Sequence, residues 1–322
     1  MTERQKTAFA DKQTETKNRN IMNKTIHTLA CAAAALMLAS CAGNDDDLGQ
    51  VVVPGTDYEL PQGKNSAADQ TIMQYYEKYG SYFLYEFTDK DFEWSLVNTS
   101  TVGDDTYRYD AIDPAKVPNL LTAIQKGWLD FYTDDFLKKA LPYRVLLAED
   151  VQIRERTFDW STWEYVFDWV NKPSRHIANQ MALGNIDDEW DNLSAYDKRS
   201  FKSYVQTDFL QYCVEQGLIT IPDEFYAVSD YSTEMSWSAT SVDARNAGFV
   251  YDPHEDLEWS IDGSISKTAD VNAFIASLVY RTTDQWADDL QYDYVKRKYD
   301  ILVAALESAG IDILTIGNTT FK

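Results

Sequence analysis

Cysteine content sets the strongest limit on how this chain can fold. Three cysteines occur, and two of them, Cys31 and Cys41, lie in a stretch with the features of an export leader. Once that leader is removed, Cys213 remains alone and no disulfide can form within the chain. An exported chain of about 280 residues must then be stabilised by its core. A hydrophobic content of 44% is enough for one large domain or two closely packed ones.

The leader begins at Met22 and continues with Lys24 and an apolar run from Leu29 to Ala39. At about a dozen residues, this run is too short for a membrane-spanning helix and is typical of a secretory signal. The residues "LASC", which end at Cys41, resemble the lipobox of bacterial lipoproteins. This resemblance implies cleavage before Cys41 and acylation of that cysteine, whereas an ordinary leader with a coincidental cysteine is the alternative. We expect residues 1–41 to be an upstream extension followed by a lipoprotein signal peptide.

The segment after Cys41 is acidic and rich in small residues. Its first residues, "AGNDDDLG", resemble the surface-export signal of Bacteroidetes lipoproteins, although a solvated tether would use the aspartates equally well. Gly, Pro, Asp and Ser remain frequent up to about Ala67, which is typical of a linker. We therefore expect a flexible acidic tether over 42–67 and one folded domain over 68–322. The expected location is the outer membrane, with a lipid anchor and exposure at the cell surface; anchoring that faces the periplasm is the alternative.

The chain is strongly acidic, with 52 acidic and 29 basic residues and a net charge of −23. A chain cleaved before Cys41 would keep 49 acidic and 23 basic residues, a net charge of −26. Such a field repels phosphate backbones and sulfated or carboxylated glycans, and no Lys/Arg cluster in the sequence offers a local exception. The composition therefore argues against a nucleic-acid partner.

Hydrophobic periodicity predicts an α+β fold that is mostly helical, with a small sheet near the N-terminal part. Ser194 and Asp197 form a capping-box-like start for one of the helices, and Gly80 and Gly217 are suited to end helices. The predicted helices cover 67–80, 114–130, 194–217, 270–280 and 290–310, and the predicted strands cover 81–87 and 143–153.

Aromatic residues are unusually dense in "FDWSTWEYVFDWV", where Trp160, Trp163 and Phe167 follow helical spacing. We expect most of the tryptophans in the chain to fill the core. A minority in a cleft could stack on sugar rings or hold a peptide.

Several segments, taken in order, resemble the zinc-binding metallopeptidase lipoproteins of Bacteroidetes. The likeness runs from about Thr71 to Ile313 and is carried by "YYEKYGSYFLYEF", "WLDFYTDDFLKKALPYRVLLAED", a histidine-bearing segment, "IPDEFYAVS", "ARNAGFV", "DVNAFIASLV" and "YDYVKRKYDILVAALESAGIDI". The resemblance implies a zincin-like fold, with an H-E-x-x-H helix and an acidic zinc ligand on a later helix.

The H-E-x-x-H motif is degenerate in this chain. Two histidines four residues apart on a helix can reach one zinc ion, and the glutamate between them takes a proton from the zinc-bound water. The matching segment here is "HIANQ", in which His176 could match the first ligand. Ile177 stands at the position of the base and cannot accept a proton, and Gln180 offers only an amide oxygen as second ligand. We predict that His176 lies on the helix that would carry zinc and is a relic of the site.

The later helix keeps one carboxylate, Asp270, where the resemblance implies acidic residues. His254 is the other histidine outside the leader, and it lies in a distant loop. A zinc site would therefore need a rearranged set of ligands, such as His176, His254 and Asp270.

These observations favour a surface lipoprotein without catalytic zinc and with no cofactor. We expect it to act as a binding or scaffold component in nutrient capture at the outer membrane. Relatives in the family it resembles are often encoded beside TonB-dependent transporters, which implies such a complex as partner. The aromatic content and the negative charge favour a neutral glycan or peptide as ligand. The alternative is an active zinc metallopeptidase with the rearranged ligands.

Overall fold

The computed structural model describes residues 58–93, 106–236, 238–254 and 263–321. The chain divides into two units, Met1–Tyr58 and Glu59–Lys322, and the fold below is that of the second unit. The predicted leader, with Cys41, and most of the predicted tether lie outside the described residues. In the part of the chain that is described, no helix is both long and apolar enough to cross a membrane.

The folded unit begins at Glu59, earlier than the predicted boundary at residue 68. Helix α2 spans Ser66–Tyr79, and the side chain of Asn65 caps it by accepting hydrogen bonds from the first backbone N–H groups. The backbone N–H of Lys64 donates to the phenol oxygen of Tyr85, which fixes the preceding segment to the body of the unit. The last residues of the predicted tether therefore belong to the folded unit.

The sheet is organised around one long strand, β3 (Arg144–Asp159). The first part of β3 is a buried apolar run that lies between two parallel neighbours, β1 (Tyr82–Leu84) and β6 (Gln180–Leu183). The later part of β3 pairs antiparallel with β2 (Tyr107–Ala111) and β4 (Glu164–Asn171). Strand β5 (Ser174–Ile177) completes the sheet by antiparallel pairing with β6. The result is a six-stranded mixed sheet in the order β1-β3-β6-β5, with β2 and β4 attached to β3.

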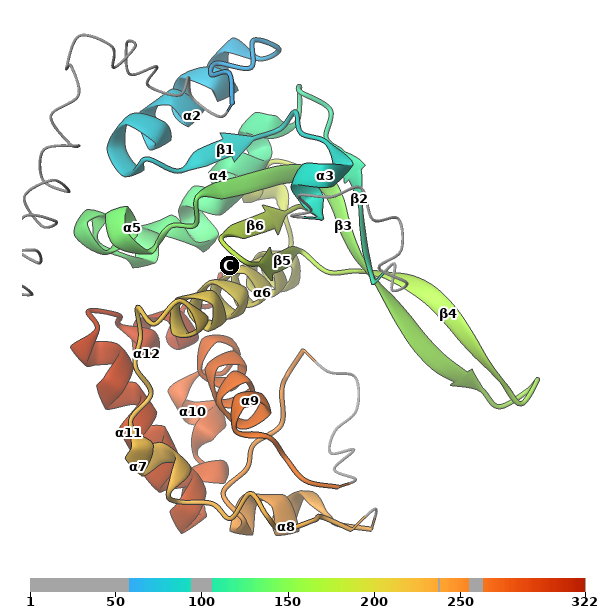
Figure 1. The fold of residues 1–322 in the computed structure, drawn as a ribbon, viewed down its shortest axis with the longest axis vertical. Helices are drawn as coiled ribbons and strands as arrows, with labels where there is room; N and C mark the ends of the chain where they lie inside the picture. Colours follow the sequence, from blue (N-terminus) through green and yellow to red (C-terminus); the bar gives the residue numbers. More distant parts are fainter. Residues whose placement is uncertain (1–57, 94–105, 237, 255–262, 322) are drawn as a thin grey trace, which may run out of the picture. The chain divides into compact units, whose positions relative to one another are not determined.

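Helices make up most of the remaining structure (Figure 1). The longest is α6, over Ala195–Glu215, which packs against β5, α4 and α9. The other α-helices are α3 (Asp89–Phe92), α4 (Val117–Gly127), α5 (Asp134–Ala140), α7 (Asp223–Tyr226), α8 (Ser241–Asn246), α9 (Lys267–Tyr280), α10 (Thr283–Trp286), α11 (Asp293–Ser308) and α12 (Ile313–Asn318). Short 3-10 turns lie at Leu129–Phe131, Trp190–Asn192 and Asp289–Gln291. The prediction of a mostly helical α+β fold is confirmed.

The strongest local signals in the sequence correspond to real helix ends. Ser194 accepts a hydrogen bond from the backbone N–H of Asp197 and caps α6, as predicted. Gly80 adopts a left-handed conformation at the end of α2, which a residue without a Cβ does at little cost. The two predicted C-terminal helices are α9 and α11.

One prediction about secondary structure is wrong. His176 lies on strand β5 and not on a helix, so the placement expected for a zincin helix fails. The segment 158–170, for which neither a helix nor a strand was predicted, forms the end of β3, a turn and most of β4. In this segment strand pairing overrides the helical spacing of Trp160, Trp163 and Phe167.

Candidate functional site

The "HIANQ" segment is the turn of a β-hairpin. Ile177, the last residue of β5, pairs with Gln180, the first residue of β6, and Ala178 adopts a positive φ of 50° between them. Asn179 stabilises this turn from its side chain, which accepts hydrogen bonds from the backbone of Tyr143 and the phenol of Tyr212. Residues 176 and 180 therefore lie on different strands and cannot share one helix face.

His176 bridges two carboxylates of helix α6. Its Nδ1 lies 3.3 Å from Oδ1 of Asp208, and its Nε2 lies 3.3 Å from Oε1 of Glu215. Burial lowers the pKa of His176, but the hydrogen bond and charge of Asp208 and the charge of Glu215 outweigh burial and raise it. The protonated ring that this favours donates from both nitrogens and has no lone pair for a metal ion.

Asp208 is the buried partner that holds this group together. It accepts hydrogen bonds from Ser174 Oγ at 2.5 Å and from the His176 ring. Burial raises the pKa of Asp208, but the His176 hydrogen bond and the charge of Lys172 bring the pKa down to about 2. The group is a hydrogen-bonded cluster that joins β5 to α6.

His254 lies in a second and separate group. Its Nε2 is 2.7 Å from Oγ of Ser203 in α6, its Nδ1 is 3.4 Å from Oδ1 of Asp252, and its ring stacks on Tyr204. The partners Ser, His and Asp are those of a nucleophilic triad. This grouping could not be predicted from the sequence, because Ser203 lies about 50 residues before the other two. Ser203 is fully buried, whereas a nucleophile must reach its substrate. The contact therefore anchors the His254 loop to α6.

Asp270 lies on α9, as predicted, and forms a third group. Its Oδ2 accepts hydrogen bonds from Nζ of Lys298 and from the phenol of Tyr231, both at 2.6 Å. The side chains of Asp270 and Lys298 are both completely buried. Burial raises the pKa of Asp270 and lowers that of Lys298, and the attraction between them opposes both shifts. The Lys298 ammonium also lies over the rings of Phe225, Tyr231, Phe249 and Phe274.

The structure does not bring the three predicted ligands together. His176, His254 and Asp270 each contact a different set of partners, and Asp270 is neutralised by a buried lysine. Across the described ranges, no group of three His, Cys, Asp or Glu side chains is arranged to hold a metal ion. The residues present do not fit a zinc centre of the kind the sequence suggested, and no catalytic step through zinc follows from them.

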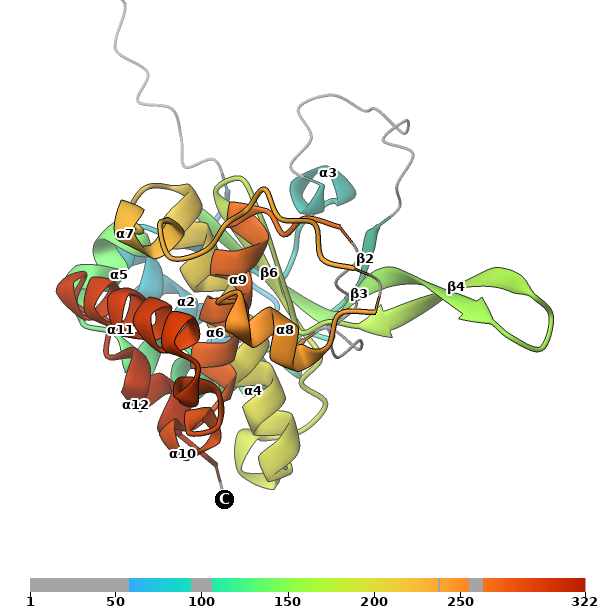
Figure 2. The ribbon, with the colours of Figure 1, turned by 90° about the horizontal axis from the view of Figure 1, so that it is seen from below.

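A different feature stands out from the surface of this unit. The outer part of β3, from Gln152, pairs with β4 in a two-stranded ribbon that we call the arm, residues 152–171. Figures 1 and 2 both show the arm extending away from the helices of the unit. In the described part of the chain, β4 pairs with β3 alone, so its outer edge has no neighbouring strand.

One face of the arm carries alternating aromatic and arginine side chains, and we call it the aromatic face. Directly paired residues share a face, which places Arg154 with Trp169, Arg156 with Phe167, and Phe158 with Tyr165. The guanidinium groups lie over neighbouring rings, with Arg154 4.3 Å from the Phe167 centroid and Arg156 3.7 Å from that of Tyr165. Such stacking contributes about 0.5–1 kcal/mol at an exposed site.

The aromatic face extends at both ends. At its base, Arg108 of β2 lies 4.5 Å from the Trp169 ring and donates a hydrogen bond to Gln152. At its tip, Trp160 and Trp163 pack edge-on against each other and against Phe158. The whole face is therefore formed by Arg108, Arg154, Arg156, Phe158, Trp160, Trp163, Tyr165, Phe167 and Trp169.

These rings are exposed, so they are not among the tryptophans that were expected to fill the core. Trp160 is 74% exposed and Trp163 is 73% exposed, and Tyr165 and Phe167 are more than half exposed. Other tryptophans do fill the core as predicted, namely Trp128, Trp190 and Trp286. Large exposed apolar groups that gather on one surface mark interaction sites.

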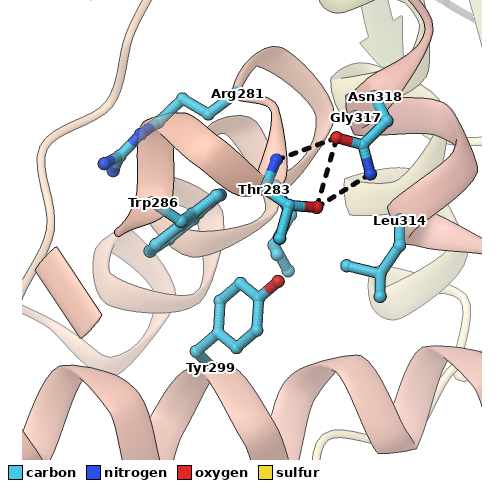
Figure 3. Close-up of a pocket in the computed structure, with 8 residues that line it drawn as sticks. Arg281, Thr283, Trp286, Tyr299, Leu314, Gly317 and Asn318 are labelled. Atoms are coloured by element: carbon cyan, nitrogen blue, oxygen red, sulfur yellow. Dashed lines mark hydrogen bonds between the residues drawn. The ribbon is translucent and has the colours of Figure 1, made fainter. Parts of the chain in front are cut away.

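A crevice between α9, α10, α11 and α12 is too tightly filled to be a binding site (Figure 3). Its polar groups satisfy one another, since Asn318 accepts hydrogen bonds from the backbone and hydroxyl of Thr283 and donates one back. Arg281 packs over Trp286 and pairs with Asp289. This crevice joins the C-terminal helices and has no room for a ligand.

Comparisons with known proteins add little to these observations. No family profile and no curated protein matches the sequence. A solved structure from Bacteroides caccae ATCC 43185, described as a "putative zinc-binding metallo-peptidase", matches with a TM-score of 0.48 and 12% sequence identity. The match covers 81% of this chain and 92% of that one.

Proposed function

We propose that this chain is a non-catalytic binding protein that contacts a macromolecular ligand through the aromatic face of the arm. One observation carries the proposal: a row of exposed aromatic and arginine side chains lies on a two-stranded ribbon that extends from the folded unit. Tryptophan, tyrosine and arginine are the residues that contribute most often to binding energy at interfaces. Rings stacked against each other are also already ordered, which reduces the entropy lost on binding.

The partners of the histidines support a non-catalytic role. His176 lies between two carboxylates, and Ser203, the hydroxyl that faces His254, is buried. Neither group presents a reactive atom to a substrate. The ligand classes suggested by the sequence, a neutral glycan or a peptide, remain part of the proposal.

Removing the rings at the tip of the arm should abolish most of the binding. We expect the double variant Trp160→Ala/Trp163→Ala to bind at least tenfold more weakly, because each anchoring ring contributes about 1–2 kcal/mol. Affinity would be measured by calorimetry against a panel of neutral polysaccharides, peptides and polyanions, with product release assayed in parallel. Val166→Ala/Val170→Ala is the matched control, since these apolar residues are exposed on the opposite face. Cleavage of a panel member, or equal affinity of the two variants, would contradict the proposal.

The proposed location is the cell surface, with a lipid anchor at Cys41 in the outer membrane. The lipobox-like "LASC" and the acidic segment after it support this location. An anchored binding protein could deliver its ligand to a TonB-dependent transporter, which is the partner implied by the family resemblance. Nutrient capture is then the proposed cellular role.

The anchor has a simple test. Because acylation requires the cysteine thiol, Cys41→Ala should move the protein from the membrane fraction to the soluble fraction of lysed cells. Fractionation followed by immunoblotting would show the shift, with Ser40→Ala as the neighbouring control. If the Cys41→Ala protein stays in the membrane fraction, the anchor lies elsewhere.

A further inference from the structure

Charges on the arm are sorted between its two faces. Within the arm, the aromatic face carries Arg154 and Arg156 and no carboxylate. Arg108 lies at its base, where the next paired residues on the same face are Asp110 and Asp150. The opposite face carries all four carboxylates of the arm, which are Glu155, Asp159, Glu164 and Asp168. In the sequence, Glu155 stands between Arg154 and Arg156, so the three charges appear mixed. On strand β3 successive side chains point to opposite faces, and Glu155 therefore lies on the face opposite to the two arginines.

The arginines of this face lack acidic partners. Among the described residues, no ion pair joins Arg108, Arg154 or Arg156 to a carboxylate, although the chain has 52 acidic and 29 basic residues. All three are exposed, and each stacks on a ring. Arg108 donates through Nε to Gln152. In Arg154 and Arg156, stacking occupies the flat side of the guanidinium group and leaves its N–H edge available, and that edge matches the two oxygens of a carboxylate.

We propose that the aromatic face binds a carboxylate-rich peptide segment of a partner protein. This inference rests on the proposed function and specifies its ligand. The apolar rings would contact the apolar side chains of the segment, and the arginines would pair with its Glu or Asp side chains. Because no carboxylate of the described residues forms an ion pair with Arg154 or Arg156, the complementary charge comes from the partner.

The geometry of the arm favours a peptide over an acidic polysaccharide. Glycans and small ligands are usually held in concave sites, whereas the rings of the arm lie on an extended ribbon. The outer edge of β4, over Glu164–Asn171, has no neighbouring strand among the described elements. An extended peptide can hydrogen-bond to such an edge through its backbone, which a polysaccharide cannot do. Alternate side chains of the added strand would then fall on the aromatic face.

The test compares two synthetic peptides, one alternating Glu and Val and the other alternating Gln and Val, with the full mature chain. At an ionic strength of about 0.15 M we expect the Glu peptide to bind at least about tenfold more tightly than the Gln peptide. Arg154→Gln/Arg156→Gln should remove this preference. Glu155→Gln is the matched control, because it neutralises a charge that lies between positions 154 and 156 in the sequence but on the opposite face of the arm. This variant should still bind the Glu peptide more tightly than the Gln peptide. Thermal unfolding of each variant checks that the fold is retained.

Three outcomes would overturn the inference: equal binding of the two peptides, an unchanged preference in the double arginine variant, or tighter binding of polygalacturonate than of the Glu peptide. The proposed function is tested separately by the Trp160→Ala/Trp163→Ala variant. If that variant loses binding while the Glu and Gln peptides bind equally, the arm is the binding surface, and only the proposed preference for an acidic peptide is wrong. If neither set of variants changes binding, the arm is not the binding surface.

Discussion

Asp270→Ala should lower the free energy of unfolding by about 3–5 kcal/mol, the largest effect we expect from a single substitution in this chain. Asp270 and Lys298 have completely buried side chains, and among the residues that the structure describes this carboxylate is the one acid paired with the ammonium group. Removing the carboxylate leaves a charge among the rings of Phe225, Phe249 and Phe274, where water cannot solvate it. Denaturant unfolding followed by circular dichroism would measure the change.

Two further variants distinguish the effect of charge on stability from the effect of packing. Tyr231→Phe removes one hydrogen bond to the same carboxylate and should cost only about 1 kcal/mol. Asp270→Leu/Lys298→Met removes both charges and should recover most of the stability, because an apolar pair of similar volume avoids the cost of desolvating two ions. If Asp270→Ala does not fold, the double variant still decides the question. A double variant as unstable as Lys298→Met alone would show that charge is not the cause.

Lys202 should make stability rise with pH above neutrality. Its side chain is fully buried, and its ammonium donates hydrogen bonds to the backbone carbonyl groups of Ile316 and Thr319. Burial, with a smaller contribution from the charge of Arg199, lowers the pKa of Lys202 to about 7. In the unfolded chain the pKa is the ordinary value of 10.5, so the unfolded state binds the extra proton between these values. The free energy of unfolding therefore increases as pH rises through this window.

The comparison with Lys202→Met isolates this contribution from all other titrating groups. The wild-type chain should gain about 2.5 kcal/mol of stability relative to the variant between about pH 6 and about pH 9, since each pKa unit corresponds to about 1.4 kcal/mol. Denaturant unfolding of both proteins at several pH values gives the difference directly. A difference that stays constant with pH would show that Lys202 keeps its proton in the folded state.

Local chemistry in the sequence was sufficient to predict the longer α-helices, which are α2, α4, α6, α9 and α11, but not the short ones. The Ser194 cap, the glycine at the end of α2 and the apolar stripes of α9 and α11 depend on residues within a few positions of one another. Such signals are contained in a short window of sequence, and tertiary structure did not override them.

The strands near the candidate sites could not be predicted in the same way. In 163–169, Trp163, Tyr165, Phe167 and Trp169 alternate with other residues, which is a strand pattern, but the spacing of Trp160, Trp163 and Phe167 also fits a helix. His176 has a position set by pairing with β6 and by carboxylates more than 30 residues away on α6. Contacts of this kind come from the fold, and a single sequence does not reveal them.

The distribution of charge on the arm also could not be predicted from the sequence. Arg108 joins Arg154 and Arg156 only through the pairing of β2 with β3, so these arginines form no cluster in the sequence. The net charge of −23 describes the whole chain, but an arginine-bearing face could not be predicted from it.

The length of the arm has an electrostatic consequence. Eight paired residues, from Gln152 to Asp159, give the ribbon a length of about 24 Å. The Debye length is about 8 Å at physiological ionic strength and about 30 Å at 0.01 M salt. Under physiological conditions the tip, with Trp160 and Trp163, therefore lies about three screening lengths from the base of the arm, whereas Arg156 lies within about two of them. The field of the acidic body is thus weak at the tip and stronger at the arginines. In dilute buffer the negative field of the body extends over the whole arm, so an acidic partner would be repelled before it reached the rings.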